Sequence, residues 1–276
     1  MEPQPHHPPH GAADPRLAAD LALALEAVRA AGTLARARFG GPLDVRQKGS
    51  QGPVTDVDLA VDRLLHAELM GARPDYGWLS EETAEDGSRL TRARSWVVDP
   101  IDGTRAFVAG RPHWTVCVGL LVDGVAAAGV VYNPMTEECF HASLGQGAFR
   151  NDAPIRASSQ TGIEGCRMLG DARMFQHPAW PKPWPPMQVE TRNSIAYRMC
   201  LVAAGDFDAA VALSAKSDWD VAAAAVIVAE AGGVAGTHTG AAFAFNGPEP
   251  TQTSLLASGS ALHPLLRARM DHIQLP

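Results

Sequence analysis

Residues 99–104 read Asp-Pro-Ile-Asp-Gly-Thr, so two carboxylates stand three positions apart and glycine and threonine follow them directly. Carboxylates in such an arrangement can bind hard cations, and the backbone N–H groups beside them can bind an anion. This is the ligand set that a magnesium-assisted reaction on a phosphate requires. Because Asp, Pro and Gly also form turns, an ordinary surface turn is the alternative interpretation of the hexapeptide.

Spacing excludes two other kinds of Asp/Gly-rich loop. An EF-hand loop that began at Asp99 would need a Glu at its twelfth position, which is Gly110. It would also need oxygen-bearing side chains where Ile101 and Gly103 stand. An aspartyl-phosphate phosphatase with the pattern Asp-x-Asp-Gly-Thr would need its nucleophile at position 100, which is Pro100.

The segments on either side predict that the hexapeptide lies inside folded structure. The apolar run 95–98 predicts a buried strand, and carboxylates at the C-terminal end of such a strand face the crevice where α/β proteins bind ligands. Downstream, the β-rich runs 115–122 and 125–132 are separated by Asp123-Gly124, a strong hairpin signal. These flanks make a free surface turn a poor interpretation.

Further elements lie in a fixed order around the hexapeptide: Asp58, Glu81-Glu82, Trp219-Asp220 and, after eleven intervening residues, Gly232-Gly233. In this respect the chain resembles the inositol monophosphatase superfamily of metal-dependent, lithium-sensitive phosphomonoesterases, over residues from about 17 to about 260. The resemblance implies an α+β fold, a layered αβαβα sandwich with two α/β subdomains. We expect these subdomains at 15–157, with most metal ligands, and at 158–276, with Asp220.

The resemblance also implies a ligand set for two or three Mg²⁺ ions. The side chains that it assigns to the metals, together with one backbone carbonyl, belong to Glu81, Asp99, Ile101 (the carbonyl), Asp102 and Asp220. Glu81 and Asp99 would hold the first ion, whereas Asp99, Asp102 and Asp220 would hold the second. A third, weaker ion would lie near Glu81.

By the same resemblance, Thr104 and Asp58 form a hydrogen-bonded pair that orients and deprotonates the attacking water together with Glu81. The backbone N–H groups of Gly103 and Thr104 would contact the phosphate oxygens. Lys48, which precedes the loop at 54–55, matches a lysine near the metal site of several members. It would either attract phosphate or only stabilise the loop.

Elementary electrostatics favours the same assignment. Four clustered carboxylates repel one another unless they are protonated or neutralised by cations. Asp220 begins an apolar segment that runs from 221 to 231 and is followed by Gly232-Gly233, which predicts a helix. A carboxylate in the first turn of a helix is favoured by the helix dipole. Plain helix capping is therefore the alternative role for Asp220.

The substrate is less well determined by the sequence. Inositol monophosphatases usually carry a glutamate about seven residues before the Trp-Asp aspartate, where this chain has Ala212 and Leu213, so inositol phosphate is in doubt. Residues 194–198 resemble the Gly-Ser-Ser-Leu-Lys stretch of 3'(2'),5'-bisphosphate nucleotidases, with Ser194 near its start and Arg198 in place of the lysine. Arg198 could bind a second phosphate, or it could simply lie on the surface of a helix.

We therefore favour a 3'(2'),5'-bisphosphate nucleotide as substrate and keep two alternatives, inositol 1-phosphate and histidinol phosphate. Residues 102–107 have the sequence Asp-Gly-Thr-Arg-Ala-Phe, which resembles that of histidinol-phosphate phosphatases. A catalytically silent binding protein on the same fold is the alternative from another functional class. Family members are commonly homodimers, so the resemblance also implies a homodimer.

Composition limits the partners and the compartment. The 276 residues carry a net charge of −7, which argues against nucleic acid or an anionic membrane as a partner. We expect neither a membrane span, which needs about 18 consecutive apolar residues, nor a signal peptide. The four cysteines (117, 139, 166 and 200) lie far apart in apolar segments and predict buried, reduced thiols in a cytoplasmic protein.

The remaining segments give coarser predictions. Residues 1–14 are rich in proline and histidine and predict a disordered leader. Helices are expected at 15–39, 57–70 and 194–204, with Asp56 and Asp62 on the solvated side of the second, and a strand at 207–211. Residues 173–188 hold five prolines and two tryptophans and are too irregular for a helix. This segment either covers the substrate or packs on the surface.

Overall fold

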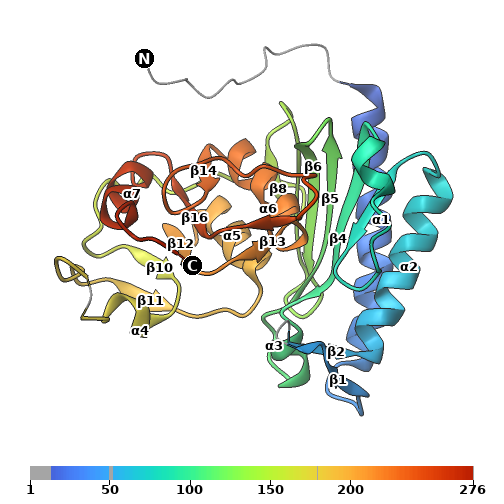
Figure 1. Cartoon of the computed structure of the whole chain (residues 1–276), viewed down its shortest axis with the longest axis horizontal. Coiled ribbons are helices and arrows are strands. Elements are labelled where there is room, and N and C mark those ends of the chain that lie inside the picture. The colour runs from blue at the N-terminus through green and yellow to red at the C-terminus, as the bar shows by residue number, and fades with distance from the viewer. Residues whose placement is uncertain (1–13, 50–51, 179, 276) are drawn as a thin grey trace.

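The computed structural model describes residues 14–49, 52–178 and 180–275, so residues 1–13 of the predicted leader lie outside the described part. Within it no helix is long and apolar enough to cross a membrane. Asp14, the last residue of the predicted leader, accepts a hydrogen bond from the backbone N–H of Arg16 and caps the first helix. Figure 1 shows alternating layers of helix and sheet, which confirms the predicted αβαβα sandwich.

Two long helices form the first layer. They are α1 (Pro15–Arg38) and α2 (Asp56–Ala72), and both were predicted within two residues at either end. Their apolar stripes, which include Val28 and Leu65, pack in one core cluster with Trp96 and Val98 of the neighbouring sheet. The first layer is held by burial of one face of each helix, as an amphipathic pattern requires.

The second layer is a seven-stranded sheet in the order β3-β4-β5-β6-β7-β8-β9. Only β3 and β4 pair in parallel; the other neighbours are antiparallel. The strands are β3 (Gly77–Ser80), β4 (Arg94–Asp102), β5 (Thr115–Val122), β6 (Val125–Asn133), β7 (Glu138–Ser143), β8 (Ala148–Arg150) and β9 (Ala153–Pro154). Asp123 and Gly124 both have positive φ, as a tight β5–β6 hairpin requires, which confirms that prediction.

Helices α5 (Ile195–Ala203) and α6 (Asp218–Glu230) form the middle layer. Side chains from both helices share a core cluster with residues of the seven-stranded sheet and of the second sheet. Glycines let α6 lie directly on the first sheet: a Cβ at Gly129 of β6 would lie 2.2 Å from the backbone oxygen of Ala223, and one at Gly119 of β5 would lie 3.1 Å from its nitrogen. These glycines therefore fix how closely α6 approaches the sheet.

The fourth layer is a five-stranded sheet in the order β11-β10-β12-β16-β14. Its strands are β10 (Arg167–Leu169), β11 (Gln188–Glu190), β12 (Ala209–Ala212), β14 (Gly233–Gly236) and β16 (Leu255–Gly259). The strand predicted at 207–211 is β12, shifted by one or two residues. Helix α7 (His263–Met270) packs on the outer face through Leu266 and Met270. The two sheets fall on either side of residue 157, and the division into subdomains at that residue stays a prediction.

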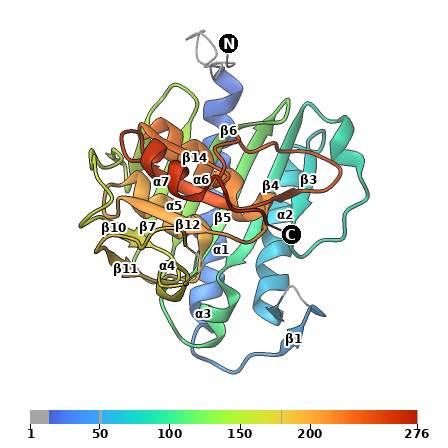
Figure 2. The ribbon, with the colours of Figure 1, turned by 60° about the vertical axis from the view of Figure 1, so that its left-hand side comes forward.

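Two small antiparallel pairs complete the strands: β1 (Val45–Gln47) with β2 (Pro53–Thr55), and β13 (Lys216–Ser217) with β15 (Thr251–Gln252). Figures 1 and 2 both place the β1–β2 pair at the same end of the molecule as the short helix α3 (Thr104–Val108), which follows the hexapeptide. Lys48, directly after β1, is thereby brought towards the end of β4.

The described part of the Pro/Trp-rich segment packs on α7. Trp184 contacts the ring of Phe175, from the short helix α4 (Ala172–Phe175), with 5.0 Å between ring centroids. Arg269 of α7 donates hydrogen bonds to the backbone oxygens of Lys182 and Pro183 and lies 4.8 Å from the Trp184 ring centroid. These contacts favour a packed surface segment over a cover for the substrate.

One prediction about α2 is wrong. Asp62 is buried, and it accepts hydrogen bonds of 2.5 Å from the hydroxyls of Ser80 and Thr83, because this face of α2 lies against the end of β3. Asp56 does lie on the solvated side, where it pairs with Arg38. All four cysteines are buried free thiols, as predicted.

Candidate metal centre

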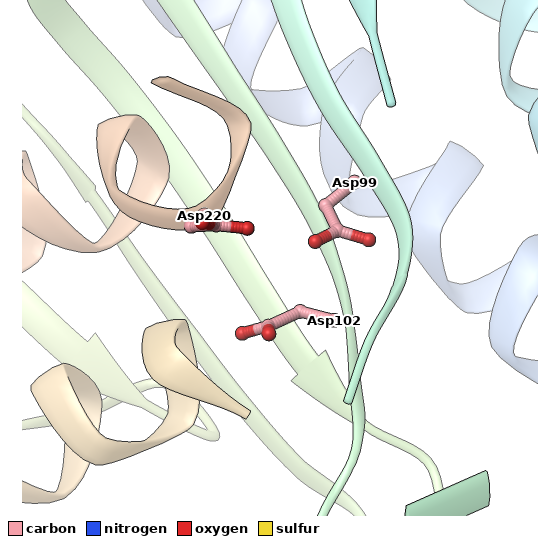
Figure 3. Close-up of side chains that lie close together, drawn as sticks. All are labelled: Asp99, Asp102 and Asp220. Atoms are coloured by element: carbon pink, nitrogen blue, oxygen red, sulfur yellow. The ribbon is translucent and has the colours of Figure 1, made fainter. Parts of the chain in front are cut away.

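The carboxylates of Asp99 and Asp102 face the same side of the sheet because β4 is irregular between them. Residues three apart in a regular strand point to opposite faces. Here Asp99 lies opposite Cys117 of β5 and Asp102 opposite Thr115, so three steps along β4 match two along β5. This bulge turns both carboxylates towards α6 (Figure 3).

Asp220 reaches the same space from the other side. It is the third residue of α6, and its Oδ2 accepts a hydrogen bond of 2.8 Å from the backbone N–H of Ser217, the residue that caps the helix. The capping role suggested by the sequence is therefore real, but it occupies only one carboxylate oxygen. Figure 3 shows the Asp220 side chain directed into the space between the helix and β4.

These three carboxylates form one group. Asp99, Asp102 and Asp220 each offer an oxygen within 4.8 Å of the other two; the first two are buried and Asp220 is partly exposed. Burial, together with the neighbouring negative charges, raises the pKa of Asp99 well above its usual value. Burial likewise raises the pKa of Asp102 to about 6 and that of Asp220 to about 7. The group is therefore costly to ionise without a cation.

An unpaired oxygen shows what the group can accept. Oδ1 of Asp99 is buried and has no hydrogen-bond partner among the described residues. An ionised carboxylate can only accept, so it calls for a donor or a cation at this point. Hard oxygen ligands at this spacing are those that Mg²⁺ or Ca²⁺ takes, and the residues present fit a divalent cation.

Asp102 is held in place by the first turn of α5. Its carboxylate accepts hydrogen bonds from the Ser194 hydroxyl at 2.6 Å and from the backbone N–H groups of Ile195 at 3.1 Å and Ala196 at 2.7 Å. Ser194 is fully buried, and its hydroxyl helps to hold Asp102; its predicted contact with substrate stays a prediction. Ser194 is also the N-cap of α5, where its hydroxyl accepts a hydrogen bond from the backbone N–H of Tyr197.

The predicted Thr104–Asp58 contact is present in the structure. The Thr104 hydroxyl lies 3.2 Å from Oδ1 of Asp58 and 3.1 Å from the backbone oxygen of Ile101. Asp58 also accepts hydrogen bonds from the backbone N–H and the hydroxyl of Thr55, and burial raises the pKa of Asp58. The Ile101 side chain is buried in the core below α1 and α2, which fixes its carbonyl beside Asp102.

Glu81 lies at the edge of the group and not within it. The Lys48 ammonium donates hydrogen bonds to Glu81 at 3.0 Å and to Glu82 at 2.8 Å. After burial, the charge of Glu81 is the main cause that raises the pKa of Asp99, so the two carboxylates are neighbours. Burial raises the pKa of Glu82 to about 7. Lys48 thus contacts both acids, and its positive charge partly neutralises theirs.

Gly103 joins β4 to α3 in a conformation that favours glycine. Its φ is +101°, and a Cβ there would lie 2.9 Å from the backbone oxygen of His113 and 3.2 Å from the nitrogen of Ser194. The chain therefore turns sharply between Asp102 and Thr104 while it stays packed against α5. This turn sets the first N–H groups of α3 beside Asp102, where the sequence placed the phosphate.

Two cations lie near the group, one on α5 and one on β13. Arg198 on α5 is half-buried; its Nε donates to the backbone oxygen of Arg192 at 2.6 Å, and its charge interacts with that of Asp102. Lys216 of β13 interacts electrostatically with Asp220 and with Arg198, and burial lowers its pKa. The sequence interpretation missed Lys216, although a cation four residues before Asp220 was a visible signal.

Comparisons with known proteins identify the family of this chain. The model of the inositol monophosphatase family matches residues 17–274. A histidinol-phosphatase from Mycobacterium tuberculosis is 37% identical, with 83% of this chain and 94% of that protein covered. Inositol monophosphatase 2 from Solanum lycopersicum is 33% identical, with 80% and 88% covered.

The fold comparison gives the same result. The solved structure of an IMPase from Thermotoga maritima superposes with a TM-score of 0.79 at 27% identity, covering 90% of this chain and 95% of that one. A family model that spans nearly the whole chain, relatives above 30% identity and a shared fold are consistent with one another. The chain belongs to the inositol monophosphatase family of phosphomonoester hydrolases.

Proposed function

We propose that this chain is a Mg²⁺-dependent phosphomonoesterase that hydrolyses a small phosphorylated metabolite by attack of water, without a covalent intermediate. The observation that supports this most strongly is the convergence of Asp99, Asp102 and Asp220, with one buried oxygen of Asp99 that has no hydrogen-bond partner among the described residues. Glu81 and the carbonyl of Ile101 would complete the ligand set. Two or three ions would bind.

The chain's own groups would divide the work as follows. Bound Mg²⁺ would lower the pKa of a coordinated water and neutralise phosphate charge. The Thr104 hydroxyl, held by Asp58, would orient that water, and Glu81 would accept its proton. The backbone N–H groups of Gly103 and Thr104 would bind the phosphate oxygens. Lys48 would release Glu81 to the metal and attract the incoming phosphate.

The leaving group would carry a second anion, and we propose a 3'(2'),5'-bisphosphate nucleotide. Arg198 and Lys216 lie close enough to influence each other and the acidic group. Such a pair of cations suits a phosphate better than a polyol. Positions 212 and 213, at the end of β12, are Ala and Leu, so no acid is available there to accept hydrogen bonds from an inositol.

Histidinol phosphate is the second candidate, because the relative from Mycobacterium tuberculosis bears the name of a histidinol-phosphatase at 37% identity. Inositol 1-phosphate is the third, since the relative from Solanum lycopersicum bears the name of an inositol monophosphatase. A catalytically silent binding protein on the same fold would give the acidic group no role, so it is the weakest candidate.

A phosphate-release assay with Mg²⁺ tests the proposal. The panel comprises adenosine 3',5'-bisphosphate, histidinol phosphate and inositol 1-phosphate, each with the wild type and with Asp99→Asn. We expect the bisphosphate to be turned over best, a loss of at least about 10³-fold in Asp99→Asn, and inhibition by Li⁺ and Ca²⁺. Undiminished turnover in Asp99→Asn would remove the metal assignment, and no release from any phosphomonoester would favour the silent protein.

Arg198→Met and Lys216→Met test the substrate separately. If Arg198 and Lys216 bind a second phosphate, each substitution should raise KM for the bisphosphate about 10-fold or more, while KM for inositol 1-phosphate should change little. Equal effects on all substrates would argue that these cations only stabilise the site, and best turnover of histidinol phosphate would transfer the proposal to that substrate.

Two coarser proposals complete the function. The buried free thiols of all four cysteines support a reducing, cytoplasmic setting. The homodimer rests on family membership alone, and sedimentation of the purified chain tests it.

A further inference from the structure

Arg89 is a fully buried arginine in the connection between β3 and β4, and it contacts the loop between β14 and β15. It belongs to the short helix η2 (Ser88–Thr91), in the segment that follows Glu81 and Glu82 and leads into β4. Burying a guanidinium is costly unless each donor finds an acceptor. Its neighbours therefore indicate what it holds together.

Two acceptors of Arg89 come from one distant loop, and a third partner comes from its own segment. Its two terminal nitrogens donate hydrogen bonds of 2.8 Å each, one to Oδ1 of Asn246 and one to the backbone oxygen of Gly247. Both residues belong to the loop between β14 and β15. Its Nε forms an ion pair of 2.6 Å with Glu85 in its own segment. The guanidinium thus joins the connection before β4 to the loop between β14 and β15.

That loop in turn holds the first residue of α6. The backbone N–H of Asn246 donates to Oδ2 of Asp218 at 3.2 Å, and the Gln252 side chain donates to Oδ1 of Asp218 at 2.7 Å. Asp218 is fully buried and lies two residues before Asp220 in the same helical turn. A continuous chain of hydrogen bonds therefore runs from Arg89 to the turn that carries a candidate metal ligand.

Packing supports the same junction from both sides. A Cβ at Gly77 of β3 would lie 2.7 Å from the Cβ of Arg89, so η2 is pressed flat against the strand that leads to Glu81. A separate apolar cluster joins Leu79 and Val97 of the sheet to Ala222 of α6, with Trp219 and Phe245 packed around it. The hydrogen-bonded chain lies beside this cluster and has little freedom to shift.

We propose that Arg89 is a positioning residue for the metal centre: through Asn246 and Asp218 it sets the first turn of α6, and hence Asp220, at the distance from Asp99 and Asp102 that a divalent ion requires. Without a cation the three carboxylates repel one another, so the turn must be held by other contacts. This inference rests on the proposed metal binding and goes beyond it, because it assigns metal affinity to residues that do not touch the metal.

Variants at both ends of the hydrogen-bonded chain test the inference. Arg89→Met removes the guanidinium and keeps a side chain of similar length. Arg89→Lys keeps the positive charge but not the pair of terminal nitrogens. Asn246→Gly removes the amide at the other end, and glycine tolerates the φ of +61° at this position. Arg92→Met, at an exposed arginine of the same segment, is the matched control.

The primary readout is the rise in melting temperature with Mg²⁺ concentration, which measures binding without activity. We expect Arg89→Met and Asn246→Gly to need about 10-fold more Mg²⁺ for half of the rise, as loss of outer contacts does at metal sites. Arg89→Lys should need an intermediate Mg²⁺ concentration, and Arg92→Met should match the wild type. In the double variant Arg89→Met/Asn246→Gly, the loss of free energy of Mg²⁺ binding should be smaller than the sum of the losses in the two single variants.

Three outcomes separate the possibilities. Folded variants that melt at a lower temperature, but reach half of the Mg²⁺-dependent rise at the same Mg²⁺ concentration as the wild type, would overturn the inference. Arg89 would then contribute to stability alone. If Arg89→Met does not fold, Asn246→Gly and Arg89→Lys decide by the same criterion. No Mg²⁺-dependent rise in the wild type would overturn the proposed function itself, and this inference with it.

Discussion

Asp220 shows how one side chain can serve both local structure and chemistry. One of its oxygens closes the capping box of α6 with Ser217, and the carboxylate still lies within 4.8 Å of Asp99 and Asp102. Asp102 does the same with the first turn of α5. Each hydrogen bond that orders these carboxylates also lowers the cost of their charge. The site is therefore arranged before any ligand arrives.

At the residue scale, Thr104 gives a sharp prediction. Thr104→Val keeps the shape but loses the hydroxyl that contacts Asp58, so kcat should fall about 10²–10⁴-fold with little change in KM. Thr104→Ser keeps the hydroxyl and should stay within about tenfold of the wild type. Steady-state kinetics at saturating Mg²⁺ provides the measurement. An equal loss in both variants would mean that the methyl group matters, and not the hydroxyl.

Individual residues also show the limits of sequence interpretation. The family resemblance carried by the Asp-Pro-Ile-Asp-Gly-Thr hexapeptide and by Trp219-Asp220 named the three carboxylates that converge. Sequence could not show that Ser194 lies behind Asp102, because a capping Ser and a substrate-binding Ser look the same until the burial of the hydroxyl is known. Asp62 was misplaced for a related reason: its partners come from the end of β3, outside its own helix.

At the scale of elements, the contact between α6 and the first sheet decides the geometry. Gly129 lets the backbone of α6 touch the strand, and a bulge in β4 turns two carboxylates towards it. Helices α1, α2 and α5 followed from their apolar patterns, because burial of one face is a property of local sequence. The bulge did not follow, since it depends on pairing with β5.

Gly129→Ala tests this contact. The new methyl group would collide with the backbone of Ala223, so we expect a loss of about 1–3 kcal/mol in the free energy of unfolding and a weaker response to Mg²⁺. Gly71→Ala is the matched control, because its Cβ would meet nothing within 4 Å in helix α2 and should stabilise by up to about 1 kcal/mol. Denaturant unfolding with and without Mg²⁺ measures both.

If Gly129→Ala left the unfolding midpoint and the Mg²⁺ response unchanged, the helix would have room to move, and the argument that glycine fixes Asp220 would fail. A loss of stability with an unchanged Mg²⁺ response would show that α6 shifts as a unit with its ligands.

At the scale of the whole molecule, the acidic group links stability to pH and to metal. An Asp in the unfolded chain has a pKa of about 4. In the folded protein the pKa rises to about 6 for Asp102 and about 7 for Asp220. The folded state therefore binds protons more tightly between about pH 4 and 7, and the group's contribution to stability falls as pH rises through that window.

Asp99→Asn makes this measurable, because histidines such as His263, with a pKa lowered to about 4 by burial, contribute in the opposite direction and cancel in the comparison. In EDTA we expect Asp99→Asn to melt above the wild type at pH 7.5, with a smaller difference at pH 5. Added Mg²⁺ should reverse the order at pH 7.5. Parallel melting curves at both pH values would show that the carboxylates do not repel.

The glycine contact between α6 and the sheet has a consequence for how relatives of this protein can diversify. Asp220 stands on α6, whose backbone lies directly on Gly119 of β5 and Gly129 of β6, so the position of the acidic group tolerates little remodelling. Arg198 on α5 and Lys216 on β13 lie in the stretch between β10 and α6, where short helices and strands are joined by loops. Selection can exchange one metabolite for another there and leave the hydrolytic machinery intact.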